Sequence, residues 1–263
     1  MSELLEYTIP EQMIVAGARM IRDEMMIYVG VGLPTVAAFL AKVSHAPNAT
    51  LVFETGIVRT KPCLFSVGVD SLPMQSMADL VDDLMYVNCL AQRGRVDMGF
   101  VGGGQIDRYG NINSTCIGDY TNPTIRFAGS GGGNDIASLC RDVIVTMRQK
   151  RQRFPEKVDF LTSPGYIDGK PSSRASRGML SGTGPLAVIT DLATFSFRDG
   201  EMVLETFHED AGVTLEQAKG EVGWDIKVSE DIRPTLRPNA EELRLLREEV
   251  DREKLFSSGK LQI

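Results

Sequence analysis

The first quarter of the chain alternates apolar runs with a glycine turn, and this pattern constrains the fold more than any other feature. Residues 25–30 (MMIYVG) form an apolar run typical of a buried strand, and residues 49–54 (ATLVFE) form a second one. Between them, Pro34 stands where it can open a helix over 34–44 (PTVAAFLAKVS). Strand, turn, helix and strand in this order indicate a βαβ unit and therefore a parallel sheet.

The same alternation continues along the chain and predicts an α/β protein with an open, mostly parallel sheet flanked by helices. Further helices are expected over 11–24, 75–92, 134–141, 214–222 and 239–251, and further strands over 96–102, 124–129, 142–147, 157–161, 185–190 and 193–197. Asp199-Gly200 is typical of a hairpin turn. We expect a single domain, 1–263, with a C-terminal helical appendage at about 236–256.

Composition excludes several classes of protein. The chain has 263 residues and a net charge of −7, without a basic stripe, which argues against nucleic-acid binding. The N-terminus lacks the features of a signal peptide, and no apolar run is long enough to span a membrane. Four cysteines without a CxxC pair favour reduced thiols, so we expect a cytoplasmic protein. Only two histidines are present, which leaves little for a catalytic triad or a metal site.

Glu54 is the first candidate for chemistry. It follows an apolar strand and precedes the turn-forming Gly56. Ligands of open α/β sheets bind outside the carboxyl ends of the strands, so a carboxylate there is well placed to react. The alternative is a strand-terminal glutamate that faces solvent or bonds to the amides of the next loop.

Three glycine-rich segments are candidates for binding. Gly30-Val31-Gly32 precedes a helix and could present amides to an anion, or could be a tight turn. Residues 102–115 allow close approach of a ligand to the backbone, or form a string of turns. Residues 129–135 (GSGGGND) could hold an oxyanion, or form a flexible loop.

Taken together and in this order, these segments resemble the family I CoA-transferases, and in particular β subunits of the glutaconate type. The likeness rests on Gly30, Gly32, Leu33 and Pro34, on Glu54-Thr55-Gly56-Ile57, on Gly103 to Thr115, on Gly129 to Gly132, on residues 157–160 and 162–169, and on residues 208–213 with 224–225. It covers nearly the whole chain. Residues 58–92 depart from the pattern, and Thr55 replaces a serine or asparagine.

The resemblance implies the CoA-transferase fold and a nucleophilic Glu54 that forms an acyl anhydride and then a thioester with CoA. It implies oxyanion donors at Gly131 and Gly132, with Gly30, Gly32 and Gln105 as lesser candidates. CoA thioester and carboxylic acid would be substrates, without a bound cofactor or metal. We expect an α subunit as partner, in an α₂β₂ assembly.

Alternatives remain open on the same scaffold. The chain could belong to an acyl-CoA hydrolase, a ring-cleaving hydrolase or a decarboxylase, or it could be a non-catalytic ligand-binding subunit. Ring-cleaving hydrolases and decarboxylases of this scaffold lack the nucleophilic glutamate, so Glu54 argues against both of these activities, whereas plain thioester hydrolysis stays open if the site admits water.

Overall fold

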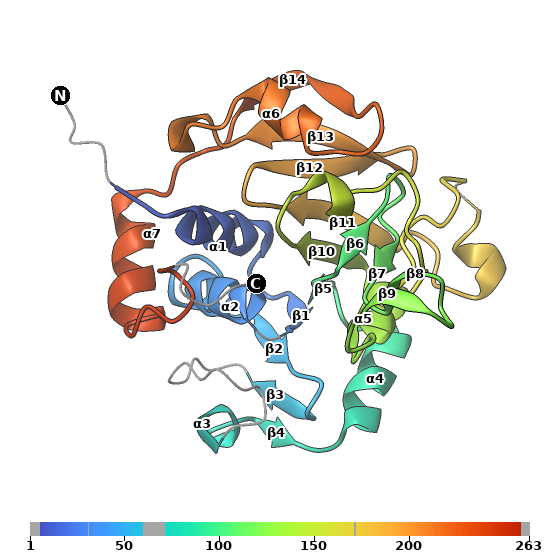
Figure 1. Cartoon of the computed structure of the whole chain (residues 1–263). Helices are drawn as coiled ribbons and strands as arrows, with labels where there is room; N and C mark the ends of the chain where they lie inside the picture. Colours follow the sequence, from blue (N-terminus) through green and yellow to red (C-terminus); the bar gives the residue numbers. More distant parts are fainter. Residues whose placement is uncertain (1–5, 31, 60–71, 171, 259–263) are drawn as a thin grey trace.

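The computed structural model describes residues 6–30, 32–59, 72–170 and 172–258. The strands are, in chain order, β1 (Met26–Tyr28), β2 (Thr50–Val52), β3 (Ile57–Arg59), β4 (Leu80–Val81), β5 (Met98–Val101), β6 (Gln105–Ile106), β7 (Ile112–Asn113), β8 (Cys116–Gly118), β9 (Pro123–Arg126), β10 (Asp142–Thr146), β11 (Gly184–Ile189), β12 (Ala193–Arg198), β13 (Glu201–Phe207) and β14 (Lys227–Pro234). Ten of them form one sheet in the order β14-β13-β12-β11-β10-β5-β1-β2-β3-β4 (Figure 1). The pairs β6–β7 and β8–β9 form two small sheets of their own.

The centre of the large sheet is parallel. Strands β2, β1, β5, β10 and β11 all run in the same direction. The edges are mixed: β3 and β4 add antiparallel strands on one side, and β12 and β13 do so on the other, where β14 then pairs parallel to β13. This arrangement confirms the predicted open, mostly parallel sheet.

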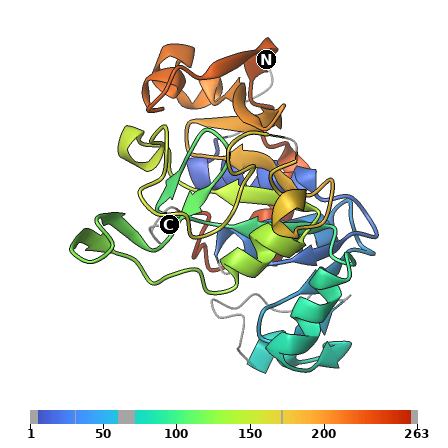
Figure 2. The same cartoon turned by 90° about the vertical axis from the view of Figure 1, so that its right-hand side faces the viewer.

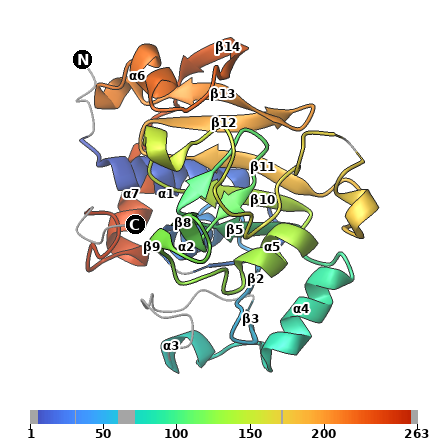
Figure 3. The same ribbon diagram turned by 45° about the vertical axis from the view of Figure 1, so that its right-hand side comes forward.

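Helices cover both faces of the sheet (Figures 1 and 3). They are α1 (Ile9–Met20), α2 (Leu33–Val43), α3 (Leu72–Gln75), α4 (Leu84–Gln92), α5 (Gly133–Leu139), α6 (Leu215–Gly220) and α7 (Ala240–Leu245), with short 3₁₀ turns η1 (Arg151–Arg153), η2 (Ala175–Arg177) and η3 (Glu209–Ala211) and a π-helical turn η4 (Leu246–Val250). Within the described ranges, no helix is both long and apolar enough to cross a bilayer.

Two hydrophobic cores explain why the central strands carry apolar side chains on both faces of the sheet. Successive side chains of a strand point to opposite faces of the sheet. In β1, Ile27 packs in the core that contains α1, α2 and η4, whereas Tyr28 belongs to the core that contains α4 and α5. Both faces of the parallel centre are therefore buried, as is usual for such sheets.

Helix α1 begins earlier and ends earlier than its periodicity predicts. The Thr8 hydroxyl accepts a hydrogen bond from the Glu11 amide at 3.2 Å, and the Glu11 carboxylate accepts one from the Thr8 amide at 2.8 Å. This capping box fixes the start of the helix. The helix ends at Met20, before a turn in which Glu24 has a φ of 65°. The expected helix over 11–24 was therefore too long at its C-terminal end.

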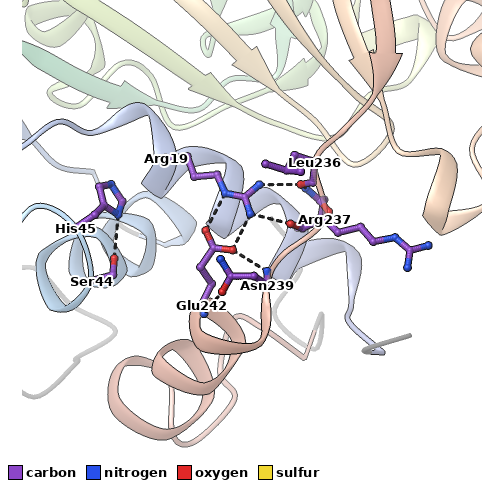
Figure 4. Close-up of polar contacts among 8 residues, drawn as sticks. Arg19, Ser44, His45, Leu236, Arg237, Asn239 and Glu242 are labelled. Atoms are coloured by element: carbon purple, nitrogen blue, oxygen red, sulfur yellow. Dashed lines mark hydrogen bonds and ion pairs between the residues drawn. The ribbon is translucent and has the colours of Figure 1, made fainter. Parts of the chain in front are cut away.

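The C-terminal helix is anchored to α1 by a polar cluster (Figure 4). The Arg19 guanidinium forms an ion pair with Glu242 at 2.6 Å and donates hydrogen bonds to the carbonyls of Leu236 and Arg237. Leu245 and Leu246 join the core shared with α1 and α2. The helix expected over 239–251 is present as α7 followed by η4. The single domain over 1–263, with its appendage at about 236–256, stays a prediction.

Three expected elements are corrected by the structure. The helix expected over 75–92 is divided into α3, β4 and α4, because residues 80–81 pair with β3 instead. The strand expected over 124–129 pairs with β8 and stays outside the large sheet. Residues 157–161 form no strand, and the Asp159 amide donates to the Gln105 side chain instead. The hairpin β12–β13 is confirmed, with φ values of 50° and 78° at Asp199 and Gly200.

Candidate active site

Glu54 stands at the carboxyl end of β2, in the parallel centre of the sheet. The Phe53 amide donates to the Ile57 carbonyl at 2.9 Å, and the Gly56 amide donates to the Phe53 carbonyl at 3.0 Å, so residues 53–57 form a tight turn. Gly56 has a φ of 90°, and a Cβ atom there would lie 2.0 Å from the Asp82 carbonyl oxygen. Only glycine fits at this position. The turn leaves the Glu54 side chain half-buried at the edge of the sheet.

The loop Ser130–Gly133 faces Glu54 from the other side. The Gly132 amide donates a hydrogen bond to Glu54 Oε2 at 3.0 Å. A Cβ atom at Gly132 would lie 2.4 Å from the same oxygen, so a larger residue would displace the carboxylate. The absence of a side chain at Gly132 allows the backbone donor to reach Glu54.

A cleft of about 200 Å³ lies between these two loops. It is lined by Tyr28, Val29, Gly30, Pro34, Glu54, Phe100, Val101, Gly102, Ser130, Gly131, Gly132, Gly133 and Ile136. These residues come from the carboxyl ends of β1, β2 and β5 and from the starts of α2 and α5. Ligands of parallel α/β sheets bind at such an edge. Among the described residues that line the cleft, Glu54 carries the only charge.

Tyr28 is a polar lining residue that the sequence did not reveal as part of the site. Its hydroxyl donates to Asn88 Oδ1 of α4 at 3.1 Å. Burial, together with the nearby Glu54 carboxylate, raises the pKa of the Tyr28 hydroxyl above its usual range, so it stays protonated. The only sequence signal for it is a single hydroxyl-bearing residue within the apolar run 25–30.

The predicted binding residues fall into two groups. Gly30, Gly131 and Gly132 line the cleft with Glu54. Gly32 instead caps α2 with a φ of 97°, and Gln105 is buried away from the cleft lining, where its side-chain oxygen accepts bonds from Asn113 Nδ2 and the Asp159 amide. Val31, which lies between Gly30 and Gly32, is outside the described residues. The catalytic and oxyanion roles stay predictions.

The segment Gln105–Thr115 forms a buried polar network rather than a binding loop. The Asp107 carboxylate accepts bonds from the Asn111 amide and side chain at 3.0 Å, and burial raises the pKa of Asp107. The Asn111 side-chain oxygen accepts bonds from the amides of Gly165 and Ile167. The network therefore ties this hairpin to the chain near residues 162–167.

That network in turn supports the start of α5. The Ser114 amide donates to Thr162 Oγ1 at 2.9 Å, and the Thr162 carbonyl accepts a bond from Asn134 Nδ2 at 2.6 Å. Asn134 lies two positions after Gly132.

Among the residues that the structure describes, no group of three or more histidine, cysteine, aspartate or glutamate side chains could hold a metal ion.

Comparison with known proteins supports the resemblance to CoA-transferases that the sequence motifs indicate. The family model for coenzyme A transferase matches residues 10–214. The chain is 36% identical over 244 residues to the B subunit of 3-oxoadipate CoA-transferase from Pseudomonas knackmussii, with 92% of each chain covered. It is 33% identical over 258 residues to the B subunit of glutaconate CoA-transferase from Acidaminococcus fermentans, with 95% of each covered.

The crystal structure of that glutaconate enzyme superimposes with a TM-score of 0.89 and 31% identity, over 97% of this chain and 98% of the other. A more distant relative is the IpdB subunit of the cholesterol ring-cleaving hydrolase of Mycobacterium tuberculosis, 27% identical, with 90% of this chain and 92% of that one covered. The chain therefore belongs to the family I CoA-transferases and corresponds to their β subunits.

Proposed function

We propose that this chain is the catalytic β subunit of a CoA-transferase in which Glu54 carries the transferred groups covalently. The observation that supports this most strongly is the half-buried Glu54 carboxylate, which lines the cleft and accepts a hydrogen bond from the Gly132 amide at 3.0 Å. No other described lining residue is charged. The substrates would be an acyl-CoA and a carboxylic acid.

In the first half-reaction, a Glu54 oxygen attacks the thioester carbon of the acyl-CoA. The carbon–sulfur bond breaks, CoA leaves as a thiolate, and an acyl-glutamyl anhydride remains. The thiolate then attacks the Glu54 carbonyl carbon, and the anhydride bond breaks. The first acid leaves as a carboxylate, and Glu54 is left as a thioester of CoA.

In the second half-reaction, the acceptor carboxylate attacks the glutamyl thioester and releases the thiolate. The thiolate attacks the acceptor's carbonyl carbon, which yields the new acyl-CoA and restores the Glu54 carboxylate. Thiolate and carboxylates react in their ionised forms, so no net proton transfer is needed. This agrees with a cleft whose described lining residues include no histidine.

The Gly132 amide has a specific task in this sequence. When one Glu54 oxygen has formed the anhydride, Oε2 becomes the carbonyl oxygen of the glutamyl group. Attack by the thiolate at that carbon places negative charge on Oε2, which already accepts the Gly132 bond. A preorganised donor at such an oxyanion stabilises the transition state by about 3–4 kcal/mol. The amides of Gly131 and Gly30 are candidates for the substrate's own oxyanion.

The experiment is covalent trapping in the assembled enzyme. We would co-express the chain with an α subunit, incubate the complex with acyl-CoA, reduce with borohydride and locate the modified residue by mass spectrometry. Modification of Glu54 is the expected result, and modification of a different residue would contradict the proposal. A hydrolase, such as the ring-cleaving relative, would consume acyl-CoA without an acceptor acid, whereas transfer requires one.

A further inference from the structure

Arg174 is a cation buried outside the cleft. The residue is 4% exposed, and none of the hydrogen-bond partners that the structure describes for its guanidinium is a carboxylate. It directly precedes η2, in the loop that projects at the right of Figure 1 and faces the viewer in Figure 2. Burial of an unpaired charge costs free energy unless its polar groups are bonded. The bonds that Arg174 makes must therefore offset this cost.

The guanidinium of Arg174 uses all five of its N–H groups within the protein. Nη1 donates to the carbonyls of Pro164 at 3.0 Å and Gly165 at 2.9 Å. Nη2 donates to the Ala137 carbonyl at 2.8 Å and to Thr183 Oγ1 at 3.1 Å, and Nε donates to the same hydroxyl at 3.3 Å. A planar fork of five donors can hold three separate segments at once, which the single nitrogen of lysine cannot.

The bond to Ala137 secures the C-terminal end of α5. The last carbonyls of a helix have no partner within the helix. The Arg141 amide, four residues after Ala137, donates to the Val96 carbonyl instead. Arg174 therefore supplies a donor that α5 does not provide for itself.

The other end of α5 carries the donor that meets the proposed nucleophile. The helix begins directly after Gly132, whose amide donates to Glu54 Oε2 at 3.0 Å. It also packs tightly on β5, because a Cβ atom at Gly99 would lie 2.3 Å from Ile136 Cγ2. With seven residues, α5 is only about 10 Å long. A shift at its C-terminal end would therefore also move the Gly132 amide.

We propose that Arg174 is a positioning residue that holds α5 in place, so that the Gly132 amide keeps its distance and angle to Glu54 Oε2. Arg174 is not among the described residues that line the cleft, so it acts through α5 and does not touch the reacting atoms. Hydrogen bonds weaken steeply when their angle is poor, and a misplacement of about 1 Å can cost about 10²-fold in rate. This inference rests on the proposed function.

Arg174→Lys in the assembled enzyme tests this role. Lysine keeps the charge but cannot bond to Ala137, the 164–165 turn and Thr183 together. Well below the melting temperature of the variant, kcat should fall about 10-fold and KM should change less than about twofold, because the Gly132 amide acts on the transition state. An unchanged kcat would contradict the proposal.

Arg19→Lys is the matched control. Arg19 also joins separate segments, since it pairs with Glu242 and donates to the carbonyls of Leu236 and Arg237. Its partners belong to α7 and to the chain just before it. The control should lower the melting temperature and leave kcat within about twofold. A kcat loss as large as that of Arg174→Lys would assign both effects to general destabilisation.

A double-mutant cycle with Gly132→Ala separates positioning from a structural role. Gly132→Ala already removes the preorganised donor, so adding Arg174→Lys should lower kcat less than about twofold further, whereas its effect on the melting temperature should persist. Equal fold losses of kcat in both backgrounds would overturn the inference. Should Arg174→Lys not fold, Thr183→Val takes its place in the cycle, since the Thr183 hydroxyl accepts two of the five bonds.

Covalent trapping distinguishes failure of this inference from failure of the proposed function. An enzyme labelled at Glu54 whose two substitutions act independently on kcat rejects only the role of Arg174. A label on a different residue rejects the proposed function, whatever the cycle gives.

Discussion

Two glycine- and asparagine-rich segments, Gly129–Asn134 and Gln105–Thr115, use their polar groups in opposite ways. In the first, the Gly132 amide reaches out to Glu54, and a Cβ atom at Gly131 would meet no described atom within 4 Å. Beside the second segment, a Cβ atom at Gly103 would lie 2.4 Å from Ile112 Cγ2. Within that segment, the side chains of Asn111 and Asn113 donate hydrogen bonds to those of Asp107 and Gln105, respectively.

The difference shows that the same composition can produce a binding loop or a rigid support. A glycine that faces open space leaves room for a ligand, whereas a glycine against a neighbouring side chain allows close packing. Residues 105–115 hold the start of α5 through Thr162 and Asn134, and α5 begins directly after Gly132. The network thus positions the donor without contacting the cleft.

Replacement of Glu54 by Gln should have the largest effect. The side chain keeps its shape but loses the nucleophile, so transferase activity of the assembled enzyme should fall on the order of 10⁴-fold or more. Steady-state rates with an acyl-CoA and an acceptor acid measure this, and circular dichroism controls for folding. Retention of more than a few per cent of the activity would remove Glu54 from the mechanism.

Gly132→Ala tests the cleft loop itself. Gly132 has a φ of −72°, which alanine adopts readily, so the variant should fold. Its methyl group would collide with Glu54 Oε2, and kcat should fall by about 10²-fold through loss of the preorganised donor.

Gly133→Ala is the matched control for that variant. A Cβ atom there would lie 3.8 Å from Ser163 Oγ, an ordinary contact. Gly133 also lines the cleft, but its methyl group would leave the hydrogen bond from the Gly132 amide to Glu54 in place, so kcat should fall by less than about threefold. Equal losses in both variants would show that the loop tolerates no side chain and would leave the Gly132 bond without a special role.

Asn111→Ala tests the supporting segment. It leaves the amides of Gly165 and Ile167 and the Asp107 carboxylate with fewer partners in a buried region. The free energy of unfolding should fall by about 2–4 kcal/mol, measured by urea denaturation. Activity per folded molecule should change little, and a large loss of kcat without a loss of stability would contradict the supporting role.

Gln105→Met should have the smallest effect. It decides whether Gln105 is an oxyanion donor, as the resemblance implies, or a buried residue that supports the fold. Its side-chain oxygen accepts bonds from Asn113 and Asp159, so stability should fall by about 1–2 kcal/mol. The ratio kcat/KM should change less than about threefold, whereas loss of an oxyanion donor would lower it by about 10²-fold.

The fold could be predicted well where the pattern is local. The strands at 25–30 and 142–147 and the Asp199-Gly200 hairpin are present within a few residues of their expected limits. Within the helix expected over 75–92, residues 84–92 are helical as α4, but the prediction was wrong for residues 76–83, where pairing of β4 with β3 overrides helical periodicity. It was also wrong for residues 157–161, where Asp159 bonds to the Gln105 side chain and to the Gly118 amide. Long-range pairing decides such segments, and no neighbour in the sequence reveals it.

The sequence by itself determined the βαβ start, the carboxylate at the end of an apolar strand and the glycine-rich loops, because each depends on residues close together in the chain. Only the tertiary structure decided that the Gly132 amide meets Glu54 across 78 residues, that Tyr28 lies beside it, and that Gln105 does not. Those contacts follow from the order of β2, β1, β5 and β10 in the sheet. Strand order is set by packing of the whole chain, so local periodicity cannot specify it.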